Sequence, residues 1–342
     1  MNQSNRTPLG FVVLALLLAG AFLLNLSLGS AAIPVGDTLG ILFGLEPGES
    51  SWGYIILEYR LPKAITAVLA GGGLALSGLL MQTLFRNPLA GPFVLGISSG
   101  ASLGAALLIM GAGVLGGWAP FLVSDLTLAV AGSLGSLLVL LVVLAVANRV
   151  KDAMALLIVG LMFGSITAAL VTVLSSFTQA ERLQQFIFWS YGSLGTLGWQ
   201  QLGWLALAYM LGVACSVALL KGLNALLLGE TYAKTLGISI PRLRNVLILA
   251  AGILAGAVTA FAGPIAFVGL AVPHLSRLAL RTTDHRILVP AVLLMGGILM
   301  LVCDTVAQLP YSDYVLPINA ITSLVGAPVV IWLLMSRRRM LF

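Results

Sequence analysis

The sequence predicts an all-α integral membrane protein. Of its 342 residues, 60% are hydrophobic and 8% are charged, and the mean hydropathy is +1.09. A soluble domain carries about 25% charged residues, and no water-soluble fold of this length could bury so much apolar surface. The apolar residues form runs of roughly 20, the length of a membrane-spanning helix, and they do not alternate as membrane strands do.

Ten such runs can be counted along the chain. They lie near residues 8–29, 61–84, 93–112, 119–147, 153–177, 201–221, 243–262, 265–281, 287–308 and 317–336. We expect a single transmembrane domain over residues 1–342, in which an N-terminal helix at 8–29 precedes core helices over 61–336. The first run exceeds the roughly 7–15 apolar residues of a secretory signal, so it predicts a retained helix.

The basic residues predict the orientation of these helices. With a cytoplasmic N-terminus, ten spans leave only Arg60, Lys63 and Arg182 of the 17 basic residues outside. Because Lys and Arg favour cytoplasmic loops, we expect both termini in the cytoplasm. The net charge of +6 is therefore a sign of membrane orientation. The cations form no exposed arm, so nucleic acid is not an expected partner.

Two long connections lie on the outer side in this topology. Residues 30–60 are rich in Gly, Pro and acids, and they predict an outer loop. Residues 178–200 begin with an amphipathic, aromatic-rich stretch, which predicts a helix lying at the membrane surface.

A polar insert, GETYAKTLGISIP, separates the sixth and seventh runs on the cytoplasmic side, at residues 229–241. Ala233, Leu236 and Ile240 recur at i, i+3 and i+7, which predicts one apolar stripe on a short helix. Gly237 is a suitable residue to end that helix. Composition leaves three roles open for it: lying on lipid, packing on the bundle, or docking into a separate protein.

Two similar Gly-Pro segments occur, one in each half of the chain. GPFVLGI at 91–97 follows the second run and GPIAFVGL at 263–270 follows the seventh, in opposite predicted orientations. This indicates an inverted repeat, as transporters often have, although chance Gly-Pro punctuation would look the same. Pairs such as Gly100 and Gly104 predict close helix packing.

The sequence lacks the motifs of common enzymes. It contains no phosphate-binding GxxxxGK[ST] loop and no HExxH, and it has only two histidines, His274 and His285. Cys215 and Cys303 are read as small buried hydrophobes. We therefore expect no enzyme, no cofactor and no metal site. Asp304 lies within a span, where an acid is a functional hypothesis by default, but a structural pairing is favoured.

The stretch RLPKAITAVLAGGGLALSGLLMQTLFRNPLAGPFVLGISSGASLG, residues 60–104, resembles the signature of the FecCD-type permeases. These are the membrane subunits of ATP-driven importers for iron chelates, haem and cobalamin. The later motifs GETYAKTLGI, GPIAFVGLAVPHLSR and LPINAITSLVGAPVVIWLL agree in order, so the resemblance runs from about residue 55 to the C-terminus.

This resemblance implies a type II ABC importer permease with ten helices in inverted-repeat halves, in the cytoplasmic (inner) membrane. Its implied partners are a second permease subunit, expected to be an identical copy, two cytoplasmic ATP-binding cassette ATPases, an extracytoplasmic substrate-binding protein and membrane lipid. The fifth and tenth helices would line the pathway. The block at Val315 and Asn319, where the family often has an acid and a glycine, departs from the pattern.

By the same resemblance, residues 229–241 match the coupling helix, and Glu230, Ala233, Leu236 and Gly237 would sit in a groove of the ATPase. Arg60 and Lys63 would meet acids on the binding protein, although snorkelling of a helix-end cation is the other explanation for Lys63.

The expected function is import of an iron chelate such as a siderophore, with haem or cobalamin next and molybdate-type substrates further behind. The alternative is a secondary transporter or channel driven by an ion gradient, which Asp304 and the apparent repeat would support. A membrane-embedded enzyme is a third, weaker alternative.

Overall fold

The structure is a computed structural model that describes residues 3–45, 49–111, 124–150, 153–310, 312 and 314–335. All regular elements within these residues are helical, and they contain no strand. Seven helices are long and apolar enough to cross a membrane: α1 (Gln3–Ser27), α4 (Leu61–Phe85), α7 (Asp125–Arg149), α8 (Ala153–Ser176), α10 (Trp199–Ala218), α13 (Ile240–Ala262) and α15 (His285–Ala307).

Three shorter apolar helices occupy the other predicted runs: α5 (Ile97–Gly111), α14 (Val268–Leu280) and α16 (Ile318–Met335). The all-α prediction is confirmed, and a helix coincides with each of the ten runs. That all ten cross the membrane stays a prediction. The start of the run at 119–147, and the basic residues Lys151 and Arg337 to Arg339, lie outside the described residues.

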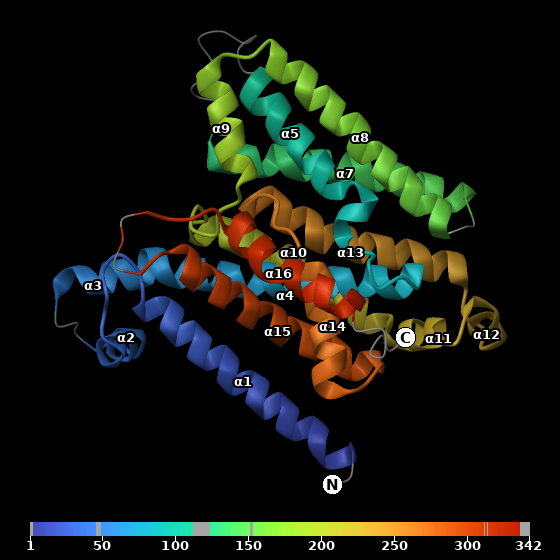
Figure 1. Ribbon diagram of the computed structural model, residues 1–342, viewed down its shortest axis with the longest axis horizontal. Coiled ribbons are helices and arrows are strands. Elements are labelled where there is room, and N and C mark those ends of the chain that lie inside the picture. Colours follow the sequence, from blue (N-terminus) through green and yellow to red (C-terminus); the bar gives the residue numbers. More distant parts are fainter. Residues whose placement is uncertain are drawn as a thin grey trace.

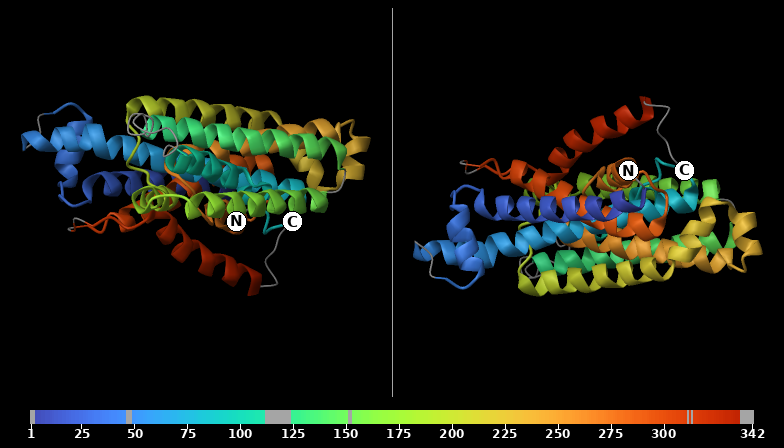
Figure 2. Two further views of the ribbon diagram at one scale, coloured as in Figure 1. Left: turned by 90° about the horizontal axis from the view of Figure 1, so that it is seen from above. Right: turned by 90° about the horizontal axis from the view of Figure 1, so that it is seen from below.

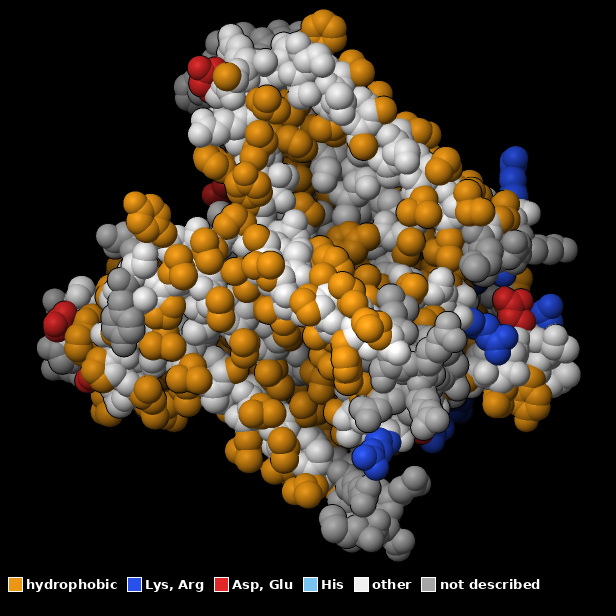
Figure 3. Space-filling view, in the orientation of Figure 1, with side chains coloured by type: hydrophobic (Ala, Val, Ile, Leu, Met, Phe, Trp, Pro, Cys, Tyr) orange, Lys and Arg blue, Asp and Glu red, His pale blue; other side chains and the backbone are white. Residues whose placement is uncertain are grey.

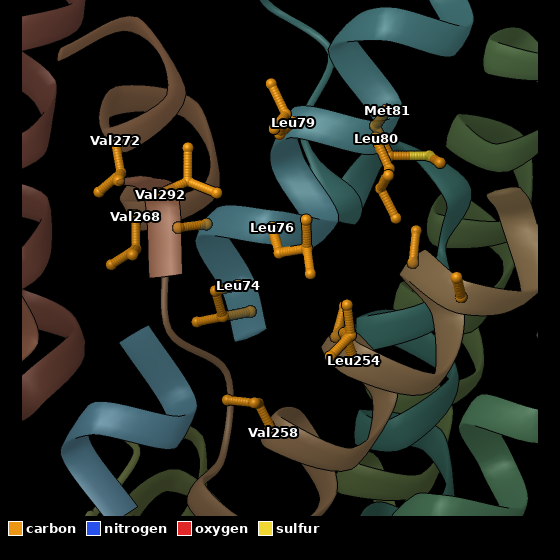
Figure 4. Close-up of a cluster of buried hydrophobic side chains, with 14 of the residues drawn as sticks. Leu74, Leu76, Leu79, Leu80, Met81, Leu254, Val258, Val268, Val272 and Val292 are labelled. Atoms are coloured by element: carbon orange, nitrogen blue, oxygen red, sulfur yellow. The ribbon is translucent and has the colours of Figure 1, made fainter. Parts of the chain in front are cut away.

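Helix α4 lies at the centre of the bundle, against α10, α13, α14 and α15 (Figure 1). Its Leu74, Leu76, Leu79, Leu80 and Met81 are at most 1% exposed. Figure 4 shows several of these side chains beside Leu254, Val258, Val268, Val272 and Val292 of the surrounding helices. The second predicted helix is therefore the buried axis around which the others pack.

Glycines let the backbones around α4 approach closely. A Cβ added at Gly78 would lie 1.8 Å from the carbonyl oxygen of Gly269 on α14. A Cβ at Gly71 would lie 2.1 Å from the carbonyl oxygen of Gly296 on α15. No other residue fits at such contacts, which is the role expected of small residues between membrane helices.

The relative direction of α4 and α13 is the one that ten alternating spans predict. Ser77 on α4 donates to the carbonyl oxygen of Ala251 on α13 at 2.9 Å, while Gly73 faces Val258. Ser77, the later residue of α4, contacts the earlier residue of α13, and Gly73 contacts the later one. The two helices are therefore antiparallel. This is the opposite orientation that an inverted repeat requires of the second and seventh helices.

The two Gly-Pro segments of the predicted repeat touch in space. A Cβ on Gly269 would lie 2.8 Å from Pro92 Cδ, and one on Gly91 would lie 3.2 Å from Leu270. Pro92 begins a 3₁₀ turn, Pro92–Leu95, that precedes α5, and the second segment precedes α14. Each segment thus breaks the chain between a long helix and a shorter one.

The expected outer loop at residues 30–60 is more helical than predicted. It contains α2 (Val35–Leu42), α3 (Ser50–Tyr54) and a π-helical segment, Ile55–Arg60, that runs directly into α4. Ile33, Ile41 and Ile56 form a small buried cluster that holds this extension against α2. These three isoleucines come from separate segments, so the sequence shows no periodic apolar run that would predict the cluster.

The remaining helices mark the two ends of the molecule. Helix α9 (Ala180–Ser190) lies where a surface helix was expected, at the end shared with α2 and α3, while α11 (Leu220–Leu227) and α12 (Glu230–Thr235) lie at the opposite end (Figure 1). On the face seen in Figure 3 the cations gather toward the α11–α12 end. Helix α16 stands away from the rest of the bundle (Figure 2).

Candidate functional site

The polar insert folds as a short helix between two glycines with positive φ. Gly229, at φ 110°, precedes α12, and Gly237, at φ 79°, follows it. Ile238 donates its backbone N–H to Ala233 O at 3.1 Å, and Gly237 donates to Lys234 O at 2.9 Å. This pair of bonds is the usual way a left-handed glycine closes a helix. The predicted helix and its stop at Gly237 are confirmed.

The predicted apolar stripe is wrong in one respect. Ala233 and Ile240 are buried, but Leu236 is 57% exposed. Tyr232 is also exposed, at 49%. The three positions do not share one helix, because α12 ends before Leu236 and Ile240 begins α13. One side of the insert therefore packs on the bundle, and the other presents Tyr232 and Leu236 outward.

Arg244 on α13 joins the insert to the end of α7. Its Nη2 lies 3.7 Å from Glu230 Oε1, and its Nη1 donates to Val150 O, at the end of α7, at 3.0 Å. Glu230 was predicted to contact a partner. In this chain it contacts Arg244, with its side chain 43% exposed.

A second anchor joins α11 to the turn before α15. Asn224 Nδ2 donates to Asp284 Oδ1 at 2.6 Å, and Asn224 Oδ1 accepts from the His285 backbone N–H at 2.9 Å and from His285 Nδ1 at 2.8 Å. The other ring nitrogen of His285 lies 2.8 Å from Thr83 Oγ1 on α4. A displacement of α11 would therefore be passed to α4 and α15.

Asp284 caps the first turn of α15. Partial burial by itself raises the pKa of this carboxyl group, but the hydrogen bonds from the Arg286 N–H and the Asn224 amide bring it below its ordinary value. The sequence pattern did not predict a role for Asn224, which appears only as a single amide inside the apolar run LKGLNALL.

At the opposite end, Arg60 is buried and turned into the protein. Its Nη1 donates to the carbonyl oxygens of Leu26 at 2.7 Å and Ser27 at 3.0 Å, and its Nη2 donates to Ala31. Only 8% of Arg60 is exposed. The guanidinium thus satisfies carbonyls at the end of α1 that have no partner within the helix.

Lys63 forms an ion pair with the intramembrane acid. Lys63 Nζ lies 3.1 Å from Asp304 Oδ1, with side chains 17% and 3% exposed. Asp304 Oδ2 also accepts from Asn25 at 2.9 Å and Gln308 at 2.7 Å. These contacts give Asp304 the structural partners that the sequence favoured, and they tie α1, α4 and α15 together.

A cavity of 610 Å³ opens beside this pair. Arg60, Lys63, Asp304 and Gln308 line one side, and Val315 and Leu316 line another. The sequence therefore brings the two predicted docking cations to one cavity. Both already have partners inside the chain.

Asn319, the residue that departs from the family pattern, joins three segments. Its Oδ1 accepts from the Ala266 N–H at 3.1 Å, and its backbone N–H donates to Tyr191 O at 3.3 Å. It thus holds the start of α16 to the end of α9 and to the middle of the second Gly-Pro segment.

No metal centre emerges from the part of the chain that the structure describes. It contains no group of three or more His, Cys, Asp or Glu side chains that could hold an ion. Cys215 and Cys303 are both free thiols; Cys303 is buried, as expected of a small hydrophobe, and Cys215 is only partly buried.

A bundle of apolar helices with a polar insert at one end and buried charges at the other is typical of a multi-pass membrane protein. Comparison with known proteins gives the family. The model of the FecCD transport family matches residues 16–336. The chain belongs to this family. It is a transport component of the inner membrane and not an enzyme.

Two kinds of relative support the assignment. The chain is 38% identical to the vitamin B12 import system permease proteins BtuC of Salmonella paratyphi A and Salmonella typhi, covering 99% of this chain and 98% of each relative. A solved metal-chelate type ABC transporter in an inward-facing conformation superposes with a TM-score of 0.82 and 32% identity, over 96% of this chain and 99% of that one. PsaBC from Streptococcus pneumoniae shares the fold, with a TM-score of 0.53 and 12% identity, over 87% of this chain and 95% of that one.

Proposed function

We propose that the chain is the permease subunit of an ATP-driven importer that carries a metal chelate or cobalamin into the cytoplasm. The family match and the full-length similarity to import permeases support this assignment. Cobalamin is the first substrate to test, because the relatives at 38% identity are named for vitamin B12. Iron chelates such as siderophores, and haem, follow from the family.

The exposed side of the polar insert is the observation that carries the proposal. Tyr232 on the six-residue helix α12 and Leu236 directly after it are apolar and about half exposed. Lipid could cover them, but a short helix with left-handed glycines at both ends, braced by Arg244, is also suited to a groove in another protein. In the proposed cycle this groove belongs to one of two cytoplasmic ATPase subunits. Glu230, Ala233 and Gly237 hold the helix in shape while Leu236 makes the contact.

Asn224 and His285 would then carry the motion inward. ATP-driven closure of the ATPases would displace α12 and, through α11, the hydrogen bonds to the start of α15 and to Thr83 on α4. Because α4 is the buried axis of the bundle, a small rotation there would alter access on both sides.

The outer cavity is the proposed docking region for an extracytoplasmic binding protein. Lys63, the less buried of the two predicted cations, would contribute a long-range attraction that Asp304 partly neutralises. We propose that a second copy of the chain covers α16, whose Leu324 and Met335 are 72% and 81% exposed. The pathway would lie between the copies, lined by α8 and α16, with both termini of each chain in the cytoplasm.

Leu236→Asp tests the ATPase contact. The tagged chain, purified in mild detergent, should retain a stoichiometric ATPase, and the variant should lose it because a carboxylate cannot enter an apolar groove without a partner. Leu45→Asp is the matched control, since Leu45 is 66% exposed at the other end of the molecule. Both variants should keep the unfolding temperature of the wild type.

The same experiment addresses the alternative of a secondary transporter. A wild-type chain that copurifies with no ATPase, yet moves substrate on a proton gradient, would overturn the importer proposal. Asp304 gives that alternative little support, since its carboxylate is already paired with Lys63 and hydrogen-bonded by two amides.

A further inference from the structure

A second cavity, of 270 Å³, lies at the end of the molecule that carries α11 and α12. It is lined by Gln82, Thr83, Arg86, Leu227, Arg277, Thr283 and His285. These residues come from the C-terminal end of α4 and its cap, the end of α11, α14, and the turn before α15 with the first residue of that helix. Six of the seven are polar, and none of these lining residues is a carboxylate.

Two guanidinium groups face this cavity from opposite elements. Arg277 is 5% exposed and is held by Gln82, whose Oε1 accepts from Nη1 at 2.7 Å. Gln82 is in turn fixed by its donation to Leu270 O at 3.2 Å. These two hydrogen bonds hold the Arg277 guanidinium in a fixed position at the cavity wall.

Arg86 supplies the other guanidinium. It caps α4 in a left-handed conformation, with φ 47°, that non-glycine residues rarely adopt. This conformation turns its side chain across to α11, where Nη2 donates to Leu227 O at 3.2 Å. The backbone is therefore strained at Arg86, one of the residues that line the cavity.

We propose that this cavity binds a phosphate group between Arg86 and Arg277. Arg277 is buried and Arg86 is exposed, and two like charges that face one cavity repel each other, so a bound anion would reduce that repulsion. Planar guanidinium forks fit the oxygens of phosphate in pairs, and the Thr83 and Thr283 hydroxyls are further possible donors. Since a water takes about 30 Å³ in the liquid, the volume admits a small oxyanion with several waters.

Two sources could supply the group: free phosphate from the cytoplasm, or the headgroup of an anionic lipid in the inner leaflet, which basic residues at this level attract. In either case the anion would join α4, α11 and α14 beneath the insert. The proposal is independent of the ATP-driven cycle, because it concerns binding to this chain alone.

The test measures the unfolding temperature of the purified full-length chain. Inorganic phosphate, titrated against potassium chloride at matched ionic strength, should raise it saturably, as a ligand of the native state does. Arg86→Gln should need at least about tenfold more phosphate for the same rise, which is the effect of losing one charge-assisted contact. Arg242→Gln is the matched control, an exposed cation near the same end that does not line the cavity.

A second arm distinguishes the sources. The chain is reconstituted in phosphate-free nanodiscs of phosphatidylcholine, with or without phosphatidylglycerol. Stabilisation by phosphatidylglycerol that is lost in Arg86→Gln and kept in Arg242→Gln identifies a lipid headgroup, and a response confined to the phosphate titration identifies a free oxyanion. No saturable response in either arm, or equal responses in wild type and Arg86→Gln, would overturn the proposal.

Discussion

The ion pair of Lys63 and Asp304 should be costly to break from one side. Asp304→Asn keeps the size of the side chain but leaves the Lys63 ammonium, 17% exposed, without its counter-charge. Removing one partner of a buried pair destabilises a protein by about 3–5 kcal/mol. We expect a loss near the lower end of that range, because Lys63 retains some access to the outer cavity. Thermal unfolding in detergent measures it.

Removing both charges should restore much of the stability. The double variant Lys63→Met with Asp304→Asn leaves no buried charge, and a double-mutant cycle gives the coupling between the two residues. If Asp304→Asn alone matched the wild type, the pair would have no structural role. Transport that survives in the double variant would also remove Asp304 as a proton carrier.

Residue roles were harder to predict than residue positions. The insert at 229–241 and its end at Gly237 could be predicted, because glycine commonly adopts the left-handed conformation that ends a helix. It could not separate buried Ala233 from exposed Leu236, since that depends on where α13 begins. Nor could it show that Arg60 turns inward, because the carbonyls it binds lie about 30 residues earlier in the chain.

At the scale of helices, Gly78→Ala tests the close packing of α4 on α14. The new Cβ would lie 1.8 Å from Gly269 O, a backbone atom that cannot move without shifting its helix. Overpacking of this kind costs about 1–3 kcal/mol. Gly20→Ala on α1 is the matched control, since a Cβ there meets nothing within 4 Å. We expect a lower unfolding temperature for Gly78→Ala and no loss for Gly20→Ala.

A tolerated Gly78→Ala would mean that α4 and α14 lie further apart in the membrane than in this structure. The Gly71–Gly296 contact between α4 and α15 offers an independent check, because a Cβ at Gly71 would lie 2.1 Å from a backbone oxygen.

Helices were predictable wherever the bilayer alone dictates them. A run of about 20 apolar residues has few structures open to it in hydrocarbon, so all ten runs were located within a few residues. The helical extension over residues 50–60 was missed because it is stabilised by contact with α2 and not by its own apolar period. Residues outside the hydrocarbon can use water as a hydrogen-bond partner, and there tertiary contacts decide the structure.

For the whole molecule, the charge distribution predicts which end faces the cytoplasm. The antiparallel arrangement of α4 and α13 fits ten alternating spans, but contacts within one chain are the same in either orientation. The bias of Lys and Arg toward the α11–α12 end is what assigns that end to the cytoplasm. The α2 end, with Phe43 82% exposed, should therefore face outward.

Cysteine labelling checks this orientation. In a background with Cys215→Ser and Cys303→Ala, a cysteine at Phe43 should react with a membrane-impermeant maleimide in intact spheroplasts. One at Lys234, which is exposed on α12, should react only after permeabilisation. The reverse pattern would place the polar insert outside, where no ATPase could reach it, and the importer proposal would fail with the topology. Labelling of both sites in intact spheroplasts would mean that the number of membrane crossings between α2 and α12 is even, so one of the shorter helices, such as α5, would not cross.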